Sequence, residues 1–106
     1  MFEPTDPTED VLGEIYAERE RQDARWGEQN HPNGTGGHSF RDAADSWRRI
    51  NDDNATKGTP NHAAILLEEV FEAVAEDDVA RLREELIQVA AVACCWIEKL
   101  DREAKK

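Results

Sequence analysis

The sequence predicts an all-α fold, a domain of four antiparallel helices arranged like a four-helix bundle. Apolar residues recur at the three- and four-residue spacing of a helix in four segments. Residues that favour helix ends, mainly Asp, Ser, Thr, Pro and Gly, separate these segments. No stretch alternates apolar and polar residues as a half-buried strand would. With 106 residues, the chain is expected to form one domain spanning residues 1–106.

The first helix is expected to run from about Pro7 to Trp26. Asp6 can cap its start, Pro7 suits the first helical position, and Gly27 suits the position after the last turn. Residues 18–25 are heavily charged and are expected to face solvent. The side chains predicted to face the core are Val11, Leu12, Ile15 and Trp26.

Residues 28–38 form the one clear loop, which is rich in glycine and is expected to be flexible. A loop of this length in a small domain is usually functional or disordered. Two interpretations remain open: a lid over a substrate, with contacts from Asn30, His31 and His38, or a flexible connector. The glycines do not form a phosphate-binding motif, because no Gly-Lys-Ser/Thr sequence follows them. The two histidines lack the cysteine partners and the short spacing of a zinc site.

The second helix is expected over about residues 40–56, with Ser39 as its cap. Its apolar stripe follows helical spacing and consists of Phe40, Ala43, Ala44, Trp47 and Ile50. Arg48 and Arg49 lie beside this stripe. Two interpretations apply to them, contacts for a triphosphate or exposed helix residues, and exposure is the favoured one.

Thr59 and Pro60 predict the start of a third helix, as its N-cap and its first helical residue. The apolar part of this helix covers residues 65–74, a three-residue turn follows at 76–78, and the last helix covers residues 82–97. A turn this short makes the last two helices antiparallel neighbours.

Residues 89–97 contain no charge and no amide, so this part of the last helix is apolar on every side. Three short neighbours cannot cover all of these sides, which predicts a homodimer or homotetramer assembled through the apolar helices. The run is too short to span a membrane. Cys94 and Cys95 are adjacent and are interpreted as reduced core residues, and no signal peptide is visible, so a cytoplasmic location is expected.

The third helix is expected to have one apolar face and one acidic face. The acidic face carries Glu68, Glu69, Glu72 and Glu76. In an antiparallel hairpin folded at residues 77–78, the numbers of facing residues sum to about 155. The side chains brought to one height are then Glu69, Glu72, Glu85 and Gln88. Oxygen-bearing side chains at i,i+3 spacing on two helices are how a helical bundle builds a carboxylate metal site.

A bland alternative to the metal site is a charged helix face that is only solvated. Acidic residues are 24 of 106, so the Glu-Glu-x-x-Glu half of the pattern is expected by chance about once in a chain of this length. Two features favour the metal site. The acids flank strongly apolar helices rather than a polar tail, and the second half of the pattern falls at the matching height.

The acidic pattern also resembles a known family. Glu68-Glu69-Val70-Phe71-Glu72, and after twelve residues Glu85-Leu86-Ile87-Gln88, is similar to the Glu-Glu-x-x-Glu…Glu-x-x-Asp signature of MazG-like all-α nucleotide pyrophosphohydrolases. The similarity covers mainly residues 61–100. The resemblance implies a MazG-like helical domain that hydrolyses a (deoxy)nucleoside triphosphate to the monophosphate and pyrophosphate, by attack of water on the α-phosphorus.

The resemblance also implies the roles of individual residues. Glu69, Glu72 and Glu85 would be ligands of Mg²⁺, for which Mn²⁺ is a substitute. Glu68 would be an additional ligand or the base that activates water, and Glu68 or Glu69 would be the group nearest that water. Gln88 stands where the family has Asp, and a neutral amide oxygen is a weaker ligand for a hard cation. It is therefore expected to be a weak ligand or a residue that orients the ligands.

The formal net charge of −11 argues against a nucleic-acid-binding protein that relies on neutralising phosphates. It is compatible with a nucleotide enzyme, because bound Mg²⁺ inverts the local sign of charge. Two alternatives without catalysis remain. One is an acidic helical-bundle protein with an interaction or regulatory role, in which Gln88 marks lost catalysis. The other, which is less favoured, is a mimic of nucleic acid that occupies a basic partner.

Overall fold

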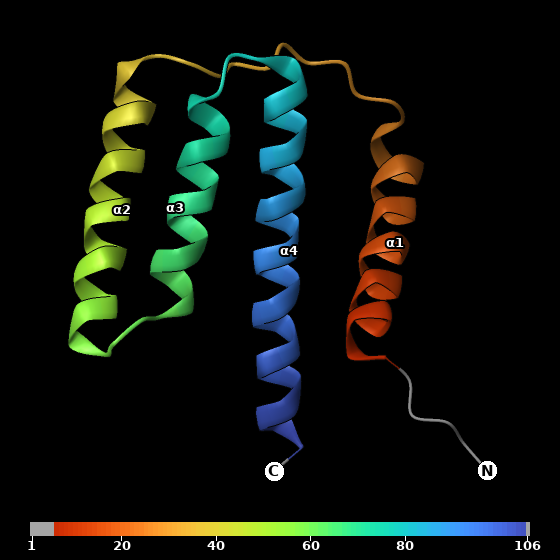
Figure 1. The fold of residues 1–106 in the computed structure, drawn as a ribbon. Coiled ribbons are helices and arrows are strands. Elements are labelled where there is room, and N and C mark those ends of the chain that lie inside the picture. The colour runs from red at the N-terminus through yellow and green to blue at the C-terminus, as the bar shows by residue number, and fades with distance from the viewer. Residues whose placement is uncertain (1–5, 106) are drawn as a thin grey trace. The chain divides into compact units, whose positions relative to one another are not determined.

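The computed structural model describes residues 6–105, and all regular secondary structure in this range is helical (Figure 1). The helices are α1 (Pro7–Trp26), α2 (His38–Lys57), α3 (His62–Ala75) and α4 (Val79–Ala104). The all-α prediction is confirmed for the described range. None of these helices is long and apolar enough to cross a membrane.

The described chain divides into two compact units, and α4 contributes to both. One unit comprises residues 6–32 and 94–105, which hold α1 and the carboxyl-terminal part of α4. The other unit, Asn33–Ala93, holds α2, α3 and the first part of α4. All of the predicted metal ligands lie in the unit Asn33–Ala93.

The ends of α1 are those that the sequence predicts. The Asp6 carboxylate accepts a hydrogen bond from the Thr8 N–H at 2.8 Å, and Pro7 takes the first helical position. At the other end, Gly27 adopts a φ of 67°, and its N–H donates to the carbonyl of Asp23 at 2.8 Å. Glycine suits this end because residues with a side chain rarely adopt a positive φ.

The predicted inward face of α1 is only partly buried. Val11 is 1% exposed, but Leu12 is 52% exposed and Trp26 is 63% exposed, so the prediction that both face the core is wrong in this chain. The physical reason is that α1 shares its unit with a single other helical segment, which can cover only a narrow stripe of it. Arg25 lies 4.9 Å from the centre of the Trp26 ring, in cation–π contact.

Two of the predicted helix starts are wrong. α2 begins at His38, after Gly37, and Ser39 lies inside the helix rather than capping it. Gly37 has a φ of 95°, a conformation that turns the chain into the helix earlier than a side-chain cap at residue 39 would allow. α3 is capped by Asn61, whose side-chain oxygen accepts from the Ala64 N–H at 2.9 Å, so Thr59 and Pro60 precede the helix.

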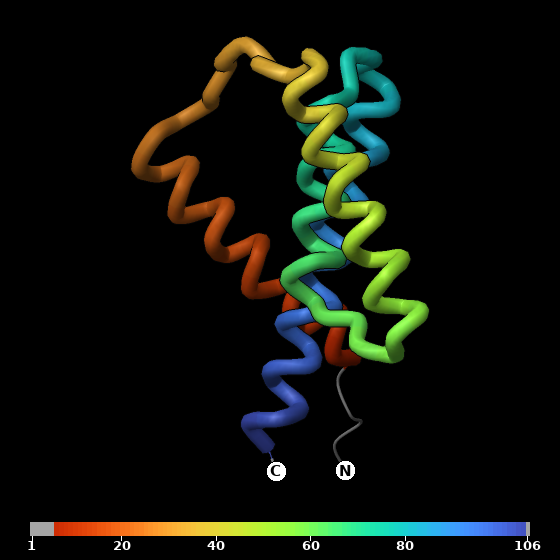
Figure 2. The backbone as a smooth tube through the Cα atoms, turned by 90° about the vertical axis from the view of Figure 1, so that its left-hand side faces the viewer, coloured from red at the N-terminus to blue at the C-terminus, as the bar shows by residue number. Residues whose placement is uncertain are grey.

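The turn between α3 and α4 has the predicted length. α3 ends at Ala75 and α4 begins at Val79, and the Asp78 carboxylate accepts from the Arg81 N–H at 2.9 Å. The loop before α2 is tied to the same end of α3, because the Gly36 N–H donates to the carbonyl of Val74 at 2.8 Å. The connection of α2 to α3 lies at the opposite end of the two helices (Figure 2).

Helices α2 and α3 pack most closely within their unit. They are the only pair of helices in residues 6–105 whose Cα atoms come within 8 Å of each other. Small side chains permit this approach: Ala44 of α2 and Ala64 of α3 are at most 4% exposed. α4 lies farther from α3, which leaves room between them for longer side chains.

The apolar run at residues 89–97 is only partly covered. Cys94 is the one buried residue in it, and the others are half-buried or exposed. Cys95 is exposed, whereas the Cys94 thiol donates to the Glu98 carboxylate at 3.4 Å. Burial and the nearby Glu98 carboxylate raise the pKa of the Cys94 thiol.

Candidate metal centre

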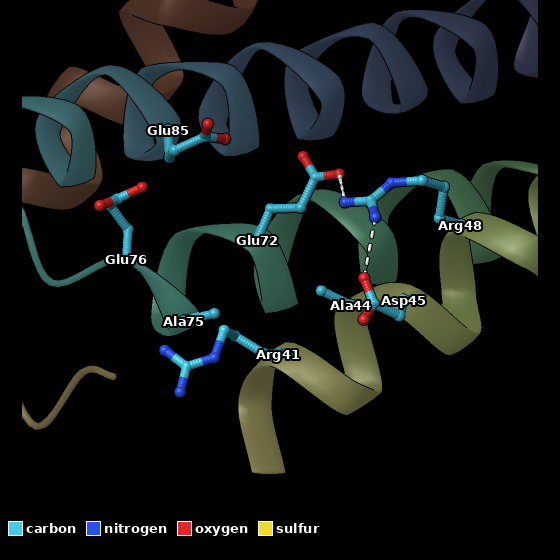
Figure 3. Close-up of a pocket in the computed structure, with 8 residues that line it drawn as sticks. All are labelled: Arg41, Ala44, Asp45, Arg48, Glu72, Ala75, Glu76 and Glu85. Atoms are coloured by element: carbon cyan, nitrogen blue, oxygen red, sulfur yellow. Dashed lines mark hydrogen bonds and ion pairs between the residues drawn. The ribbon is translucent and has the colours of Figure 1, made fainter. Parts of the chain in front are cut away.

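Three of the five predicted ligands converge in the gap between α3 and α4. One carboxylate oxygen from each of Glu69, Glu72 and Glu85 lies within 4.8 Å of the other two. Glu69 and Glu72 are one turn apart on α3, and Glu85 reaches them from α4, where Figure 3 shows its carboxylate beside that of Glu72. The helical register predicted from the short turn is therefore confirmed at this height. We refer to these three side chains as the carboxylate cluster.

The carboxylate cluster holds more negative charge than its surroundings compensate. Glu69 and Glu85 each keep one buried carboxylate oxygen that accepts no hydrogen bond from the described residues. A buried charged oxygen without a partner is unfavourable, because it has lost water and gained nothing in return. Burial raises the pKa of Glu69, and the charges of Glu85 and Glu68 raise it further.

Glu72 is the member of the cluster that has a cationic partner. Its carboxylate accepts from the Arg48 guanidinium at 3.1 Å, and the same guanidinium donates to Asp45 at 2.9 Å. Burial raises the pKa of Glu72, and Arg48 opposes this effect. The neighbouring Glu68 and Glu69 raise the pKa again, so its net direction is upward.

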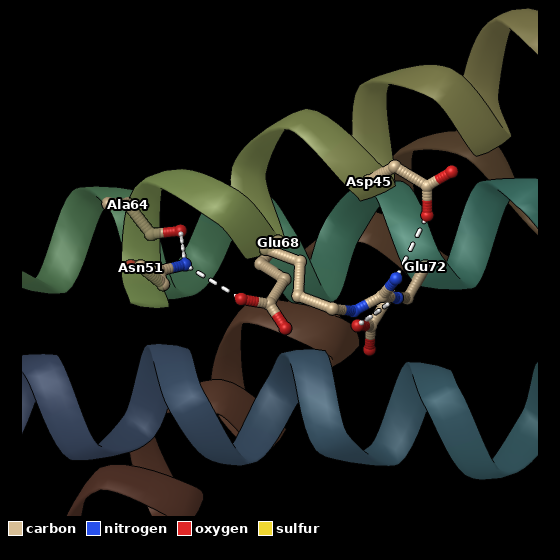
Figure 4. A network of polar contacts seen from close by, with 6 residues as sticks. Asp45, Asn51, Ala64, Glu68 and Glu72 are labelled. Atoms are coloured by element: carbon tan, nitrogen blue, oxygen red, sulfur yellow. Dashed lines mark hydrogen bonds and ion pairs between the residues drawn. The ribbon is translucent and has the colours of Figure 1, made fainter. Parts of the chain in front are cut away.

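Glu68 lies beside the cluster and is held by a residue of α2. The Asn51 amide donates to the Glu68 carboxylate at 2.9 Å and to the carbonyl of Ala64 at 2.9 Å (Figure 4). Reasoning from sequence missed Asn51. The signal that could have found it is its place four residues after Trp47, where a polar side chain continues the apolar stripe of α2.

Gln88, the fifth predicted ligand, has a different environment from Glu85. Both belong to α4 and are three residues apart, but Gln88 is exposed and Glu85 is half-buried. An exposed amide is less constrained than the carboxylates between the helices, and the role of Gln88 as a weak ligand or orienting residue stays a prediction.

A cavity of about 450 Å³ adjoins the carboxylate cluster in the same unit. Glu72 and Glu85 line it together with Glu76, the residue that follows α3. The side facing them belongs to α2 and contributes Arg41 and Arg48 (Figure 3). Arg41 was not singled out from the sequence, because nothing in its spacing distinguishes it from the other charged residues of this helix.

The histidines and the amide of the proposed lid do not lie in this cavity. Asn30 donates to Glu28 at 2.9 Å, and His31 contacts Gln29 at 3.3 Å, so both make local contacts within the loop. His31 also lines a separate cavity of about 590 Å³ with Gln22, Trp26 and Gln29. His38 is the first residue of α2 and is exposed. The structure thus provides local contacts for Asn30 and His31, and the lid stays a prediction.

The donor set of the cluster matches a hard divalent cation. Carboxylate oxygens are the protein ligands that Mg²⁺ prefers, and a cation would give the two orphaned oxygens of Glu69 and Glu85 a partner. A search of protein-family models, of curated proteins and of solved structures found no match to this chain. What the chain does is therefore inferred from the cluster, the cavity and the sequence motif.

Proposed function

We propose that this chain is a Mg²⁺-dependent nucleoside triphosphate pyrophosphohydrolase that converts a (deoxy)nucleoside triphosphate to the monophosphate and pyrophosphate. The observation that carries the proposal is the convergence of Glu69, Glu72 and Glu85 within 4.8 Å, two of them with an orphaned buried oxygen. The resemblance of the motif to the MazG-like family supports the choice of reaction. Mn²⁺ would replace Mg²⁺ at the same oxygen ligands.

Each acidic residue has a role in this proposal. Glu69, Glu72 and Glu85 would hold the metal, and Gln88 would be a weak ligand or orient the others. When bound, Mg²⁺ supplies neutralisation of phosphate charge and lowers the pKa of a coordinated water. One oxygen of Glu68 is engaged by Asn51, so its carboxylate is held in place beside the cluster.

Glu68, or alternatively Glu69, accepts the proton of the attacking water. The water oxygen forms a bond to the α-phosphorus. The bond from the α-phosphorus to the bridging oxygen breaks, and pyrophosphate leaves with that electron pair. Glu68 is a better candidate for the base than the three cluster residues, because it is positioned by a hydrogen bond and is not needed as a ligand.

A pyrophosphate-release assay on a panel of nucleoside triphosphates tests the proposal. With Mg²⁺ we expect turnover of at least one nucleotide, and none after the metal is chelated. Thermal melting without nucleotide should show a higher Tm in Mg²⁺ than in chelator, since only the folded chain assembles the ligands. Absence of turnover with every nucleotide would refute the enzymatic proposal even if the Mg²⁺ response remained.

The second candidate is a non-catalytic acidic helical protein with an interaction or regulatory role. The observation that favours it is the exposed Gln88 at the place of the family Asp. It predicts that Mg²⁺ has at most a weak effect on melting and that no nucleotide is hydrolysed. The pyrophosphate-release assay therefore separates the two functions.

We also propose that the chain forms a homodimer or homotetramer through its apolar helices. Large apolar side chains stay exposed on α4, among them Leu86 at 51% and Ile87 at 58%. Burying them against a second copy removes apolar area from water, which favours association. A clean monomer at micromolar concentration in sedimentation would overturn this.

The reduced cysteines and the nucleotide substrate favour a cytoplasmic location.

A further inference from the structure

The cavity beside the carboxylate cluster has walls of opposite charge. Glu72, Glu76 and Glu85 provide the acidic side. Arg41, Asp45 and Arg48 line the side of α2, where the charge of Asp45 is offset by its ion pair with Arg48, so this side is basic overall (Figure 3). The formal charge of the chain is −11, so the two arginines face the cluster against an acidic background. A ligand that fills this cavity meets cation-binding groups on one side and anion-binding groups on the other.

The two arginines differ in what already holds them. Arg48 donates to Asp45 and to Glu72, and these two carboxylates raise the pKa of its guanidinium. The side chain of Arg41 makes no hydrogen bond or ion pair with any residue of the described chain. Arg41 is therefore the arginine of this cavity that has its donors available.

We propose that Arg41, assisted by Arg48, binds the β- and γ-phosphates of the substrate, which leave together as pyrophosphate. This inference rests on the proposed function, because the carboxylate cluster can hold such an anion only through a bound cation. A guanidinium presents several N–H donors in one plane and pairs with phosphate oxygens in a bidentate way. Its positive charge also stabilises the charge that develops on the leaving pyrophosphate.

The same arrangement explains why the substrate should carry a polyphosphate tail. A monophosphate bound through the metal at the cluster has no second phosphate to place against α2. A diphosphate or triphosphate contacts both walls at once, and the second contact gains from being held near the first. The cavity should therefore favour pyrophosphate strongly over inorganic phosphate.

The test is a calorimetric titration of the full chain with pyrophosphate and with inorganic phosphate, both in the presence of Mg²⁺. The variant is Arg41→Gln, and the matched control is Arg49→Gln, which removes the same charge from the same helix. Arg49 donates to Ser46 and does not line the cavity. Arg41 is exposed, so its replacement should leave the helicity seen by circular dichroism unchanged.

For the parent we expect pyrophosphate to bind at least tenfold more tightly than inorganic phosphate. Arg41→Gln should weaken pyrophosphate binding by about tenfold to a hundredfold, the range for a lost charge-assisted hydrogen bond, and Arg49→Gln by less than about twofold. Equal weakening in both variants would overturn the inference, since it would show only a general charge effect. Unchanged binding in Arg41→Gln would overturn it as well.

A titration with Mg²⁺ alone and the turnover assay keep the two proposals separate. If the parent binds Mg²⁺ and hydrolyses a nucleotide but Arg41→Gln binds pyrophosphate normally, this inference fails and the proposed function stands. If pyrophosphate binding depends on Arg41 but no nucleotide is hydrolysed, the phosphate site stands and the proposed reaction fails. If the parent does not bind pyrophosphate in Mg²⁺, the inference is wrong.

Discussion

The two sides of α3 show how the spacing of helices decides between packing and chemistry. On the side of α2, the buried Ala44 and Ala64 let the backbones of the two helices approach closely. On the side of α4 the helices are farther apart, and Glu69 and Glu72 extend into the gap toward Glu85. One helix thus carries a close packing contact toward α2 and a candidate site toward α4.

The largest effect is expected for a substitution in the carboxylate cluster. Glu85→Gln should lower nucleotide hydrolysis more than about a hundredfold, because a ligand is replaced by a weaker one, while the helicity is unchanged. Glu84→Gln is the matched control, because Glu84 is the exposed neighbour of Glu85 and its replacement removes the same charge from α4. Pyrophosphate release by the three proteins is the measurement. Similar rates in both variants would show that the two faces of α4 do not differ in function.

A substitution at the alanine contact between α2 and α3 should change the stability of the fold rather than nucleotide hydrolysis. Ala64 is 3% exposed, and Ala64→Leu is expected to destabilise the fold by about 1–3 kcal/mol, because the added volume has no space at the α2 contact. Ala63→Leu places the same side chain at an exposed position of α3 and should change stability by less than about 0.5 kcal/mol. Denaturant unfolding of both variants measures the difference. Equal stabilities would mean that the α2–α3 contact is not tightly packed.

A substitution at Gln88 is expected to strengthen the binding of Mg²⁺. Gln88→Asp should tighten Mg²⁺ binding by about tenfold, because a carboxylate binds a hard cation better than an amide does. Since Gln88 is exposed, the new charge should not destabilise the fold without metal. Metal titrations of parent and variant decide the matter, and unchanged affinity would place residue 88 outside the metal site.

The smallest expected effect is the pH dependence of stability without metal. The pKa values of Glu69 and Glu72 are raised above the ordinary 4.5, so between the ordinary and the raised values the folded chain binds more protons than the unfolded chain. Their contribution to stability is therefore greatest at pH values below 4.5 and is lost as the pH rises through the raised pKa values.

Two substitutions at neutral pH sharpen this prediction. Glu69→Gln removes a like charge and should stabilise the metal-free chain by about 0.5 kcal/mol. Glu72→Gln should leave the stability of the metal-free chain nearly unchanged. The repulsion that it removes is offset by the weakened ion pair with Arg48. Denaturation at several pH values, with and without Mg²⁺, is the measurement. Added Mg²⁺ should reverse the loss of stability that the parent shows as the pH rises. If Mg²⁺ does not alter this loss, the carboxylate cluster is not a metal site.

Local signals in the sequence predicted the parts of the fold that depend on neighbouring residues. The bounds of α1 follow from Asp6, Pro7 and Gly27, and the register of α3 against α4 follows from the three-residue turn. That register was enough to predict which carboxylates meet, because an antiparallel hairpin leaves little freedom in how its residues face each other.

The features that sequence reasoning missed depend on contacts between distant segments. Asn51 meets Glu68 across two helices, and Arg41 is distinguished only by the cavity that it lines and by its lack of a partner. The start of α2 was misplaced because two consecutive glycines, Gly36 and Gly37, adopt positive φ values before the helix. Exposure of Leu12 depends on how few helices share its unit, which periodicity does not reveal.

The two neighbouring cysteines of α4 give the chain a built-in chemical reporter. Consecutive residues project about 100° apart around a helix, so a thiol reagent meets two environments. Cys94 is 4% exposed and its raised pKa keeps it in the less reactive thiol form, whereas Cys95 is exposed. A maleimide dye should therefore attach at Cys95 alone. Because Cys95 belongs to the apolar run proposed to meet a second copy, its labelling should slow at concentrations where the chain associates and recover on dilution.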